Sequence, residues 1–239
     1  MQIIQIYPQG HLLLAIAELL LIFWSISLWH KSNNLAIILS LIVLVSIGYD
    51  NVVLFAGSLL EPGDLLLYLN KIRFLIHYLF LPLLIVVGVD LANRARAAWA
   101  TTIIKRLSWV LAISLGVLDV LRRYVGSTFE PEYFAGITSY YSPNVFPVTT
   151  IAVTIFMVLI GVGILIRSRG KLPWLFIGTL AAFLGNALPA SSFGTLPASL
   201  SEFVMILSLL VTERDVTFAP ESFFVVDSGN LVTEYKNGA

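Results

Sequence analysis

Several side chains that can carry charge or hydrogen-bond strongly lie within stretches of this chain that are otherwise apolar. A charged side chain at the centre of a membrane costs about 2.5–3.5 kcal/mol on insertion scales, so such residues usually face the bundle interior and have a partner. Carboxylates, an imidazole and a guanidinium can together bind protons, ions or small polar solutes. The candidate residues for a ligand-binding or ion-binding site are Glu18, Asp50, Asn51, Asn70, Arg73, His77, Asp119 and Glu202.

Two of these residues are predicted to form an ion pair. Asp50 and Arg73 are equally far in sequence from the centre of a helical hairpin at residues 61–62. Antiparallel neighbours therefore place them at one depth, where a carboxylate and a guanidinium can form a bidentate salt bridge. Arg73 and His77 are four residues apart and share a helix face with Asn70, which predicts a polar column on the third span.

A buried network that only fixes helix register is the structural alternative. It accounts for the pair of Asp50 with Arg73. The same half of the membrane, however, is expected to hold three further acids, Glu18, Asp119 and Glu202. This excess of carboxylates predicts a hydrated cavity that opens toward the outer side.

Several other chemistries lack the residues that they need. A zinc site usually takes two or three histidines, and His11 and His30 lie at opposite ends of the first predicted helix, away from His77. A retinal Schiff base needs a lysine in the last helix, and residues 196–211 contain none. The chain also has no cysteine, which excludes thiolate metal sites. We therefore expect no metal and no other cofactor.

The composition requires a membrane. Hydrophobic residues make up 58% of the 239 residues and charged residues only 12%, against roughly 25% charged in soluble domains. The formal net charge is zero, so the chain is not expected to bind nucleic acid. No cleavage site follows the first apolar run, which is therefore interpreted as a retained helix.

Seven apolar segments are each about long enough to cross the hydrocarbon core as a helix. The sequence thus predicts an all-α bundle of seven transmembrane helices over residues 1–212 and a cytoplasmic tail over residues 213–239. The predicted spans are residues 12–29, 35–60, 65–91, 101–121, 145–166, 172–188 and 196–211.

Basic residues predict the orientation of the bundle, because short loops rich in Lys and Arg stay in the cytoplasm. Alternate loops hold Lys31, the basic group between residues 94 and 106, and the group between residues 167 and 171. The N-terminus is therefore expected outside and the C-terminus inside. A plasma or inner membrane is the expected location, with an organellar or thylakoid membrane as the alternative.

Two further segments have recognisable patterns. The longest loop, residues 122–143, is rich in aromatic residues and suits either a lid or, as we favour, an aromatic belt in the headgroup zone. The tail predicts a small β-hairpin over residues 222–235. Small residues on the sixth span predict a close approach to a neighbouring helix. They are Gly178, Ala181, Ala182 and Gly185.

The function predicted from these residues is to bind or pass a small polar solute, an ion or a proton in an outer-facing cavity. The lipid bilayer is the one certain partner, and the sequence does not indicate an oligomeric state. A membrane-embedded enzyme acting on a lipid is an alternative, with Ser46 or Ser58 as nucleophile beside His77. A sensor, or a scaffold subunit of a membrane complex, is also open.

Overall fold

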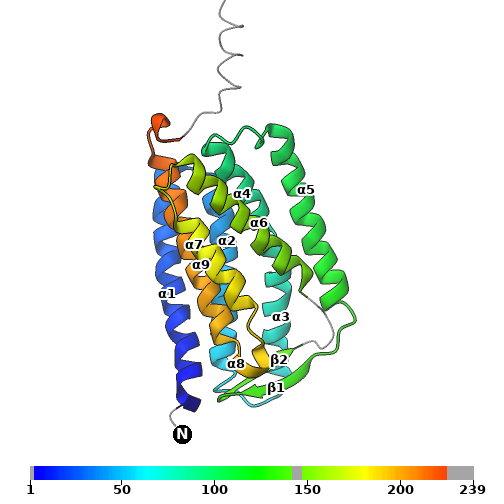
Figure 1. Ribbon diagram of the computed structural model, residues 1–239. Coiled ribbons are helices and arrows are strands. Elements are labelled where there is room, and N and C mark those ends of the chain that lie inside the picture. The colour runs from blue at the N-terminus through cyan, green and yellow to red at the C-terminus, as the bar shows by residue number, and fades with distance from the viewer. Residues whose placement is uncertain (1–2, 142–146, 225–239) are drawn as a thin grey trace, which may run out of the picture.

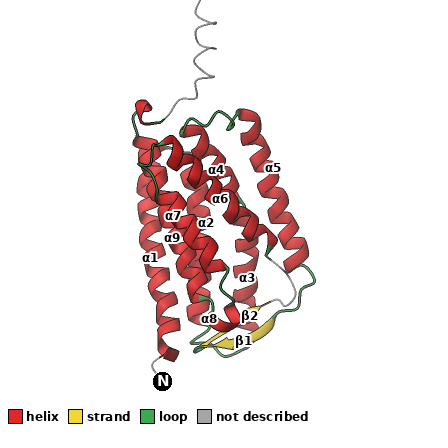
Figure 2. Ribbon diagram, viewed as in Figure 1, coloured by secondary structure: helices red, strands yellow, loops and turns green. Residues whose placement is uncertain are grey.

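The computed structural model describes residues 3–141 and 147–224 as a bundle of long helices with a β-hairpin at one end (Figures 1 and 2). We name the two ends of the bundle after their landmarks: the hairpin end, where the two strands and the start of α1 lie, and the tail end, where α9 ends. The helices are α1 Ile3–Ser32, α2 Leu35–Ala56, α3 Asp64–Phe80, α4 Leu83–Arg94, α5 Thr102–Asp119, α6 Val148–Arg167, α7 Trp174–Asn186, α8 Ala190–Phe193 and α9 Leu196–Phe218. The remaining elements are a π-helical turn, η1 Val120–Tyr124, a 3-10 turn, η2 Glu221–Phe223, and the strands β1 Glu130–Phe134 and β2 Ile137–Tyr141.

Each predicted span coincides with helix. Within the described residues, five helical stretches are long and apolar enough to cross a membrane: Ile6–Ser32, Leu35–Ala56, Asp64–Arg94, Val148–Arg167 and Leu196–Phe218. The other two predicted spans are helices as well, but α5 carries three charged residues and α7 has only 13 residues. The count of seven spans therefore stays a prediction. The last helix, predicted to end at residue 211, continues to Phe218.

The surface of the bundle is apolar. Large side chains point outward along the helices, among them Leu13 on α1, Ile103 and Val110 on α5, and Leu159 on α6, each more than 60% exposed. A soluble protein rarely exposes so large a contiguous apolar surface. The long helices and this surface are consistent with an integral membrane protein.

The third span is broken in the middle. Pro82 follows Leu81 between α3 and α4, and proline has no N–H to donate to the carbonyl of Tyr78. On the tail-end side of this break, α4 packs against α6 and α9 as well as α2 and α5. On the hairpin side, α3 packs mainly against α2, α5, η1 and β2. The core is continuous around α4, and room is left between α3 and the helices α6, α7 and α9.

Sequence analysis did not predict this hairpin, because it interpreted the loop by its aromatic residues, as a belt in the headgroup zone or a lid. Its strands pair in antiparallel register around Ala135 and Gly136, which both have positive φ, as a two-residue hairpin turn requires. Thr138 donates its N–H to the carbonyl of Gly57 at the end of α2. Tyr140 donates its N–H to Oδ1 of Asn70 on α3 at 3.3 Å. The hairpin is thus fastened to two helices, and Asn70 serves that contact.

The predicted small-residue ridge on α7 is confirmed as a helix contact. A Cβ added at Gly178 would lie 2.4 Å from the Cβ of Ser208 and 3.0 Å from the carbonyl oxygen of Val204, both on α9. A Cβ at Gly185 would lie 2.4 Å from the Cβ of Ser201. The two helices therefore approach closely along their length, because the α7 face has no side chains in the way.

Replacing Gly178 by alanine is expected to separate α7 from α9 and to destabilise the protein by about 1–3 kcal/mol, as overpacking does in a dense core. Gly163 on α6 is the matched control, because a Cβ there meets nothing within 4 Å. Thermal unfolding of purified protein in detergent measures both variants. A Gly178→Ala protein as stable as Gly163→Ala would contradict the close contact.

Candidate functional site

A chain of hydrogen bonds joins α1, α2 and the start of α9 near the hairpin end. Nδ2 of Asn51 donates to Oε1 of Glu18 at 2.8 Å, and Oδ1 of Asn51 lies 2.7 Å from Nδ1 of His11. Nε2 of His11 lies 3.1 Å from the hydroxyl of Thr195. His11, Glu18 and Asn51 are all completely buried. Two of the candidate residues, Glu18 and Asn51, thus belong to one network.

The direction of this chain is set by the amide of Asn51. Because its Oδ1 accepts, His11 donates from Nδ1, and its Nε2 then accepts from Thr195 in the neutral imidazole. Every donor therefore points toward Glu18. The second carboxyl oxygen of Glu18 has no hydrogen-bond partner among the described residues and lies near the backbone of Gly48.

His11 was missed as a functional candidate because it lies one residue before the predicted first span. Its spacing was the available signal: His11 and Glu18 are seven residues apart, two helical turns, and so share one face of α1. The partner on α2 and the hydroxyl of Thr195 come from elements whose rotation the sequence does not specify.

The predicted ion pair between Asp50 and Arg73 is confirmed. Nε of Arg73 lies 3.2 Å from Oδ1 of Asp50, and the Arg73 side chain is only 7% exposed. The geometry is not the bidentate one that was predicted. Nε and Nη1 of Arg73 have no well-aligned hydrogen-bond acceptor among the described residues, and the guanidinium instead lies 4.4 Å from the ring centroid of Phe74.

Asp119 has a local partner. Its carboxylate lies 3.5 Å from Nη1 of Arg123, one helical turn later in η1. The guanidinium of Arg123 also packs over the ring of Tyr78, at 4.4 Å from the centroid. This ion pair accounts for Asp119 without a ligand. Arg123 therefore balances the charge of Asp119.

The remaining two candidates, His77 and Glu202, line one cavity of about 470 Å³ between α3, α6, α7 and α9. It lies where α3 leaves room beside the break at Pro82. Thr150 and Thr154 on α6 and Asn186 on α7 contribute the other polar side chains of its wall. Asn186 also lies within hydrogen-bonding reach of the Glu202 carboxyl group. The arrangement combines one acid, one imidazole, one amide and two hydroxyls with an apolar lining.

Electrostatics connects this cavity to the other candidates. Asp50, Glu18 and Arg73 all interact electrostatically with Glu202. His77 interacts with two ion pairs, Asp50 with Arg73 and Asp119 with Arg123. The acids are therefore close enough to influence one another.

By their contacts with other described residues, the candidates fall into five groups: Asn70 with the hairpin, a buried hydrogen-bond chain, two ion pairs and a cavity. Hydropathy gives the depth of a residue along its helix, but not the direction in which its side chain turns. The serines considered as nucleophiles are not brought to His77 by any contact. The hydroxyl of Ser58 donates to the carbonyl of Phe55, and Ser46 has no hydrogen-bond partner among the described residues.

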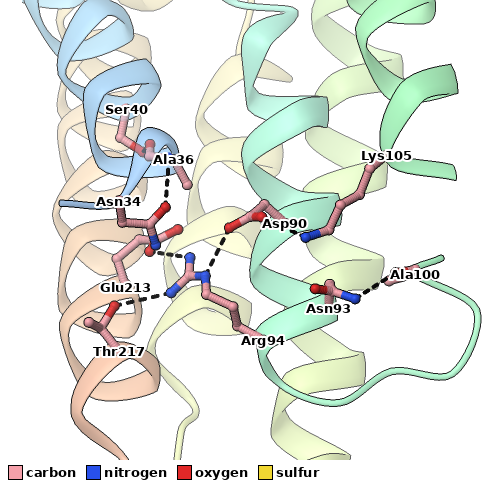
Figure 3. A network of polar contacts seen from close by, with 10 residues as sticks. All are labelled: Asn34, Ala36, Ser40, Asp90, Asn93, Arg94, Ala100, Lys105, Glu213 and Thr217. Carbon is pink, nitrogen blue, oxygen red and sulfur yellow. Dashed lines mark hydrogen bonds and ion pairs between the residues drawn. The ribbon is translucent and has the colours of Figure 1, made fainter. Parts of the chain in front are cut away.

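A second polar network, at the tail end, has Arg94 at its centre (Figure 3). Arg94 donates from Nε to Asp90 at 2.8 Å, from Nη1 to Thr217 at 3.1 Å and from Nη2 to the fully buried Glu213. Lys105 on α5 donates to the other oxygen of Asp90 at 3.0 Å. Sequence analysis did not predict the contacts of Arg94 with Glu213 and Thr217, because these two residues were placed in the tail beyond the predicted end of the last helix.

The described residues hold no group of three or more His, Cys, Asp or Glu side chains that could bind a metal ion. No known protein family model matches the chain, and no curated protein sequence matches it either. The site therefore has to be interpreted from its own geometry.

The ion pair at the hairpin end gives a direct test. Asp50→Ala leaves Arg73 buried without a counterion and is expected to cost about 3 kcal/mol, the lower end of the range for buried pairs because Asp50 is 22% exposed. Adding Arg73→Leu should recover part of this loss. Thermal unfolding of both single variants and the double variant measures the coupling. Additive losses would mean that the two side chains do not interact.

Proposed function

We propose that this protein is a membrane protein that binds a small cationic solute in the cavity between α3, α6, α7 and α9. The observation that carries the proposal is that His77 and Glu202, from separate helices, line one cavity of about 470 Å³. That volume is within the range of small-molecule sites. The few polar groups of the cavity would fix the orientation of the solute, and its apolar wall would contact the apolar part of the solute.

Charge favours a cation over an anion. Among the described residues that line the cavity, Glu202 is the one acid, and none is an arginine or a lysine. Two carboxylates, those of Asp50 and Glu18, interact electrostatically with Glu202, against one guanidinium, that of Arg73. An ammonium group next to Glu202 would relieve this excess of negative charge. A proton bound to Glu202 or His77 would be the smallest cationic ligand of this cavity.

Binding is better supported than passage. Between Glu202 and the tail-end Glu213, α9 turns Met205, Ile206, Leu209 and Leu210 into the core, each at most 3% exposed. This segment is a largely apolar barrier between the two polar ends, and passage of a solute would require α9 to move relative to its neighbours.

The proposal includes the predicted topology. With α5 and α7 as spans, the bundle crosses the membrane seven times, with the hairpin end outside and the tail end in the cytoplasm. The support is that α5 and α7 lie alongside the five long helices in the bundle, and that α5 turns apolar side chains outward (Figure 1). The basic loop residues then lie on the cytoplasmic side.

The cavity predicts a ligand dependence on Glu202. Ethylammonium, choline or putrescine is expected to raise the melting temperature of the purified protein, because a ligand that binds only the folded state stabilises it. Glu202→Gln should weaken this affinity by roughly 10- to 100-fold, the effect of removing a hydrogen bond to a charged group.

Glu130→Gln is the matched control, because Glu130 is an exposed acid on β1. It should respond to the amines like the wild type. Only the rise in melting temperature on adding ligand is compared between the variants, since removing a buried carboxylate also changes the stability of the protein without ligand. A rise that is equal in Glu202→Gln and wild type, or absent with every amine, would refute the cation site. Flux of an amine into proteoliposomes would mean that the protein passes the solute across the membrane as well as binding it.

The natural absence of cysteine makes the topology directly measurable. Glu130→Cys at the hairpin end should react with a membrane-impermeant maleimide on intact cells. Arg169→Cys, in the exposed connection between α6 and α7, should react only after permeabilisation. The reverse pattern would invert the proposed orientation. Labelling of both cysteine variants from outside would mean that the number of membrane crossings between positions 130 and 169 is not the proposed one.

A further inference from the structure

Glu18 on α1 is a completely buried acid that forms no ion pair with a described residue. Its one hydrogen bond to a described residue comes from Nδ2 of Asn51, at 2.8 Å. Four other inner acids each form an ion pair with an arginine: Asp50, Asp90, Asp119 and Glu213. The carboxyl group of Glu18 therefore has to be kept neutral in another way.

The surroundings of Glu18 offer it no positive charge. α1 packs against α2 and α9, and each of these helices brings an acid that interacts electrostatically with Glu18, Asp50 from α2 and Glu202 from α9. The cation nearest to Asp50, Arg73, is already its ion-pair partner. On α1 itself, His11 is neutral in the hydrogen-bond chain and is separated from Glu18 by one amide. A negative charge on Glu18 would thus face further acids.

The balance of free energies then decides the state of the carboxyl group. An ionised carboxylate without a counterion in an apolar interior costs more than one hydrogen bond from an amide contributes. A protonated carboxyl group carries no charge and keeps this hydrogen bond, because Oε1 still accepts from Asn51 as a carbonyl oxygen. Oε2 has no hydrogen-bond partner among the described residues, and it is the oxygen left to carry the proton.

The hydrogen-bond chain fixes which oxygen of Glu18 is free. Nδ1 of His11 donates to Oδ1 of Asn51, so the NH₂ group of the amide turns toward Oε1 of Glu18. Nε2 of His11 is held by the hydroxyl of Thr195 at the start of α9. Oε2 lies beside α2, where a Cβ added at Gly48 would be 3.7 Å from it. His11 and Thr195 are therefore positioning residues for the carboxyl group.

We propose that Glu18 is a proton-binding site of this protein, with the proton on Oε2 and with Oε1 held by Asn51. Buried acids and histidines joined in chains are the usual proton-binding groups of membrane bundles. The site is separate from the cavity of Glu202, which Glu18 does not line, and it is independent of cation binding there. The chain from Glu18 to Thr195 connects the bound proton to the hairpin end of the bundle.

Infrared spectroscopy of the purified full chain in detergent tests this site near neutral pH. A protonated carboxyl group has a C=O stretch that is separate from the bands of carboxylates and backbone amides. The wild type minus Glu18→Gln difference spectrum is expected to contain this acid stretch, shifted to lower frequency in D₂O. Glutamine keeps an oxygen that accepts from Asn51, so the variant should remain folded. Carboxylate bands in place of the acid stretch would overturn the proposal.

Glu213→Gln is the matched control, because Glu213 is also a completely buried glutamate but is paired with Arg94. Its difference spectrum should contain carboxylate bands and no acid stretch. An equal acid stretch from Glu213 would overturn the argument that the missing counterion places a proton on Glu18. If Glu18→Gln does not fold, Glu202→Gln should still show an acid stretch, and its absence there would refute the proton on Glu18.

The positioning role of His11 has a readout of its own. His11→Ala frees the amide of Asn51 to turn away from Glu18, and a carbonyl that loses a hydrogen bond absorbs at higher frequency. The acid stretch of Glu18 should therefore shift to higher frequency in His11→Ala and keep its intensity. An unchanged frequency would mean that His11 does not position the carboxyl group.

Discussion

A charged side chain that is buried in this apolar bundle needs an ion pair or hydrogen bonds. The arrangement of the helices depends on where these contacts lie. The inner ion pairs and hydrogen bonds gather at two levels. One joins α1, α2, α3 and η1 near the hairpin, and the other joins α4, α5 and α9 near the tail. Between them lie fully buried apolar side chains such as Leu44, Leu84, Met157 and Ile206. The two polar levels are therefore separate sites divided by a dry layer.

Close helix packing is what keeps that layer dry. Glycines on α7 let α9 approach until side-chain and backbone atoms touch, and Gly161 on α6 meets the backbone of Phe176 on α7 in the same way. In a membrane, such contacts replace the hydrophobic effect as the force between helices. Beside α3 the helices pack less closely, and the cavity lined by His77 and Glu202 lies there.

The sequence predicted how far each residue lies along the bundle axis, but it did not predict how each helix is rotated about its own axis. Hydropathy located the helices to within a few residues at most ends, and equal distance from a turn was enough to predict the pairing of Asp50 with Arg73. It could not show that Glu18 turns toward Asn51, because that depends on the rotation of two helices. Contacts between residues far apart in the chain, such as Arg94 with Glu213, were also out of reach. The predicted tail hairpin lies mostly outside the described residues.

Pro82 divides the third span into two helical segments, α3 and α4. At the hairpin end α3 packs against α2, α5, η1 and β2, while at the tail end α4 packs against α2, α5, α6 and α9. Gly116 of α5 sits against the carbonyls of Tyr78 and Leu79 beside this joint, where any larger side chain would press on it. The third span can therefore bend at this joint while each of its two segments stays a regular helix.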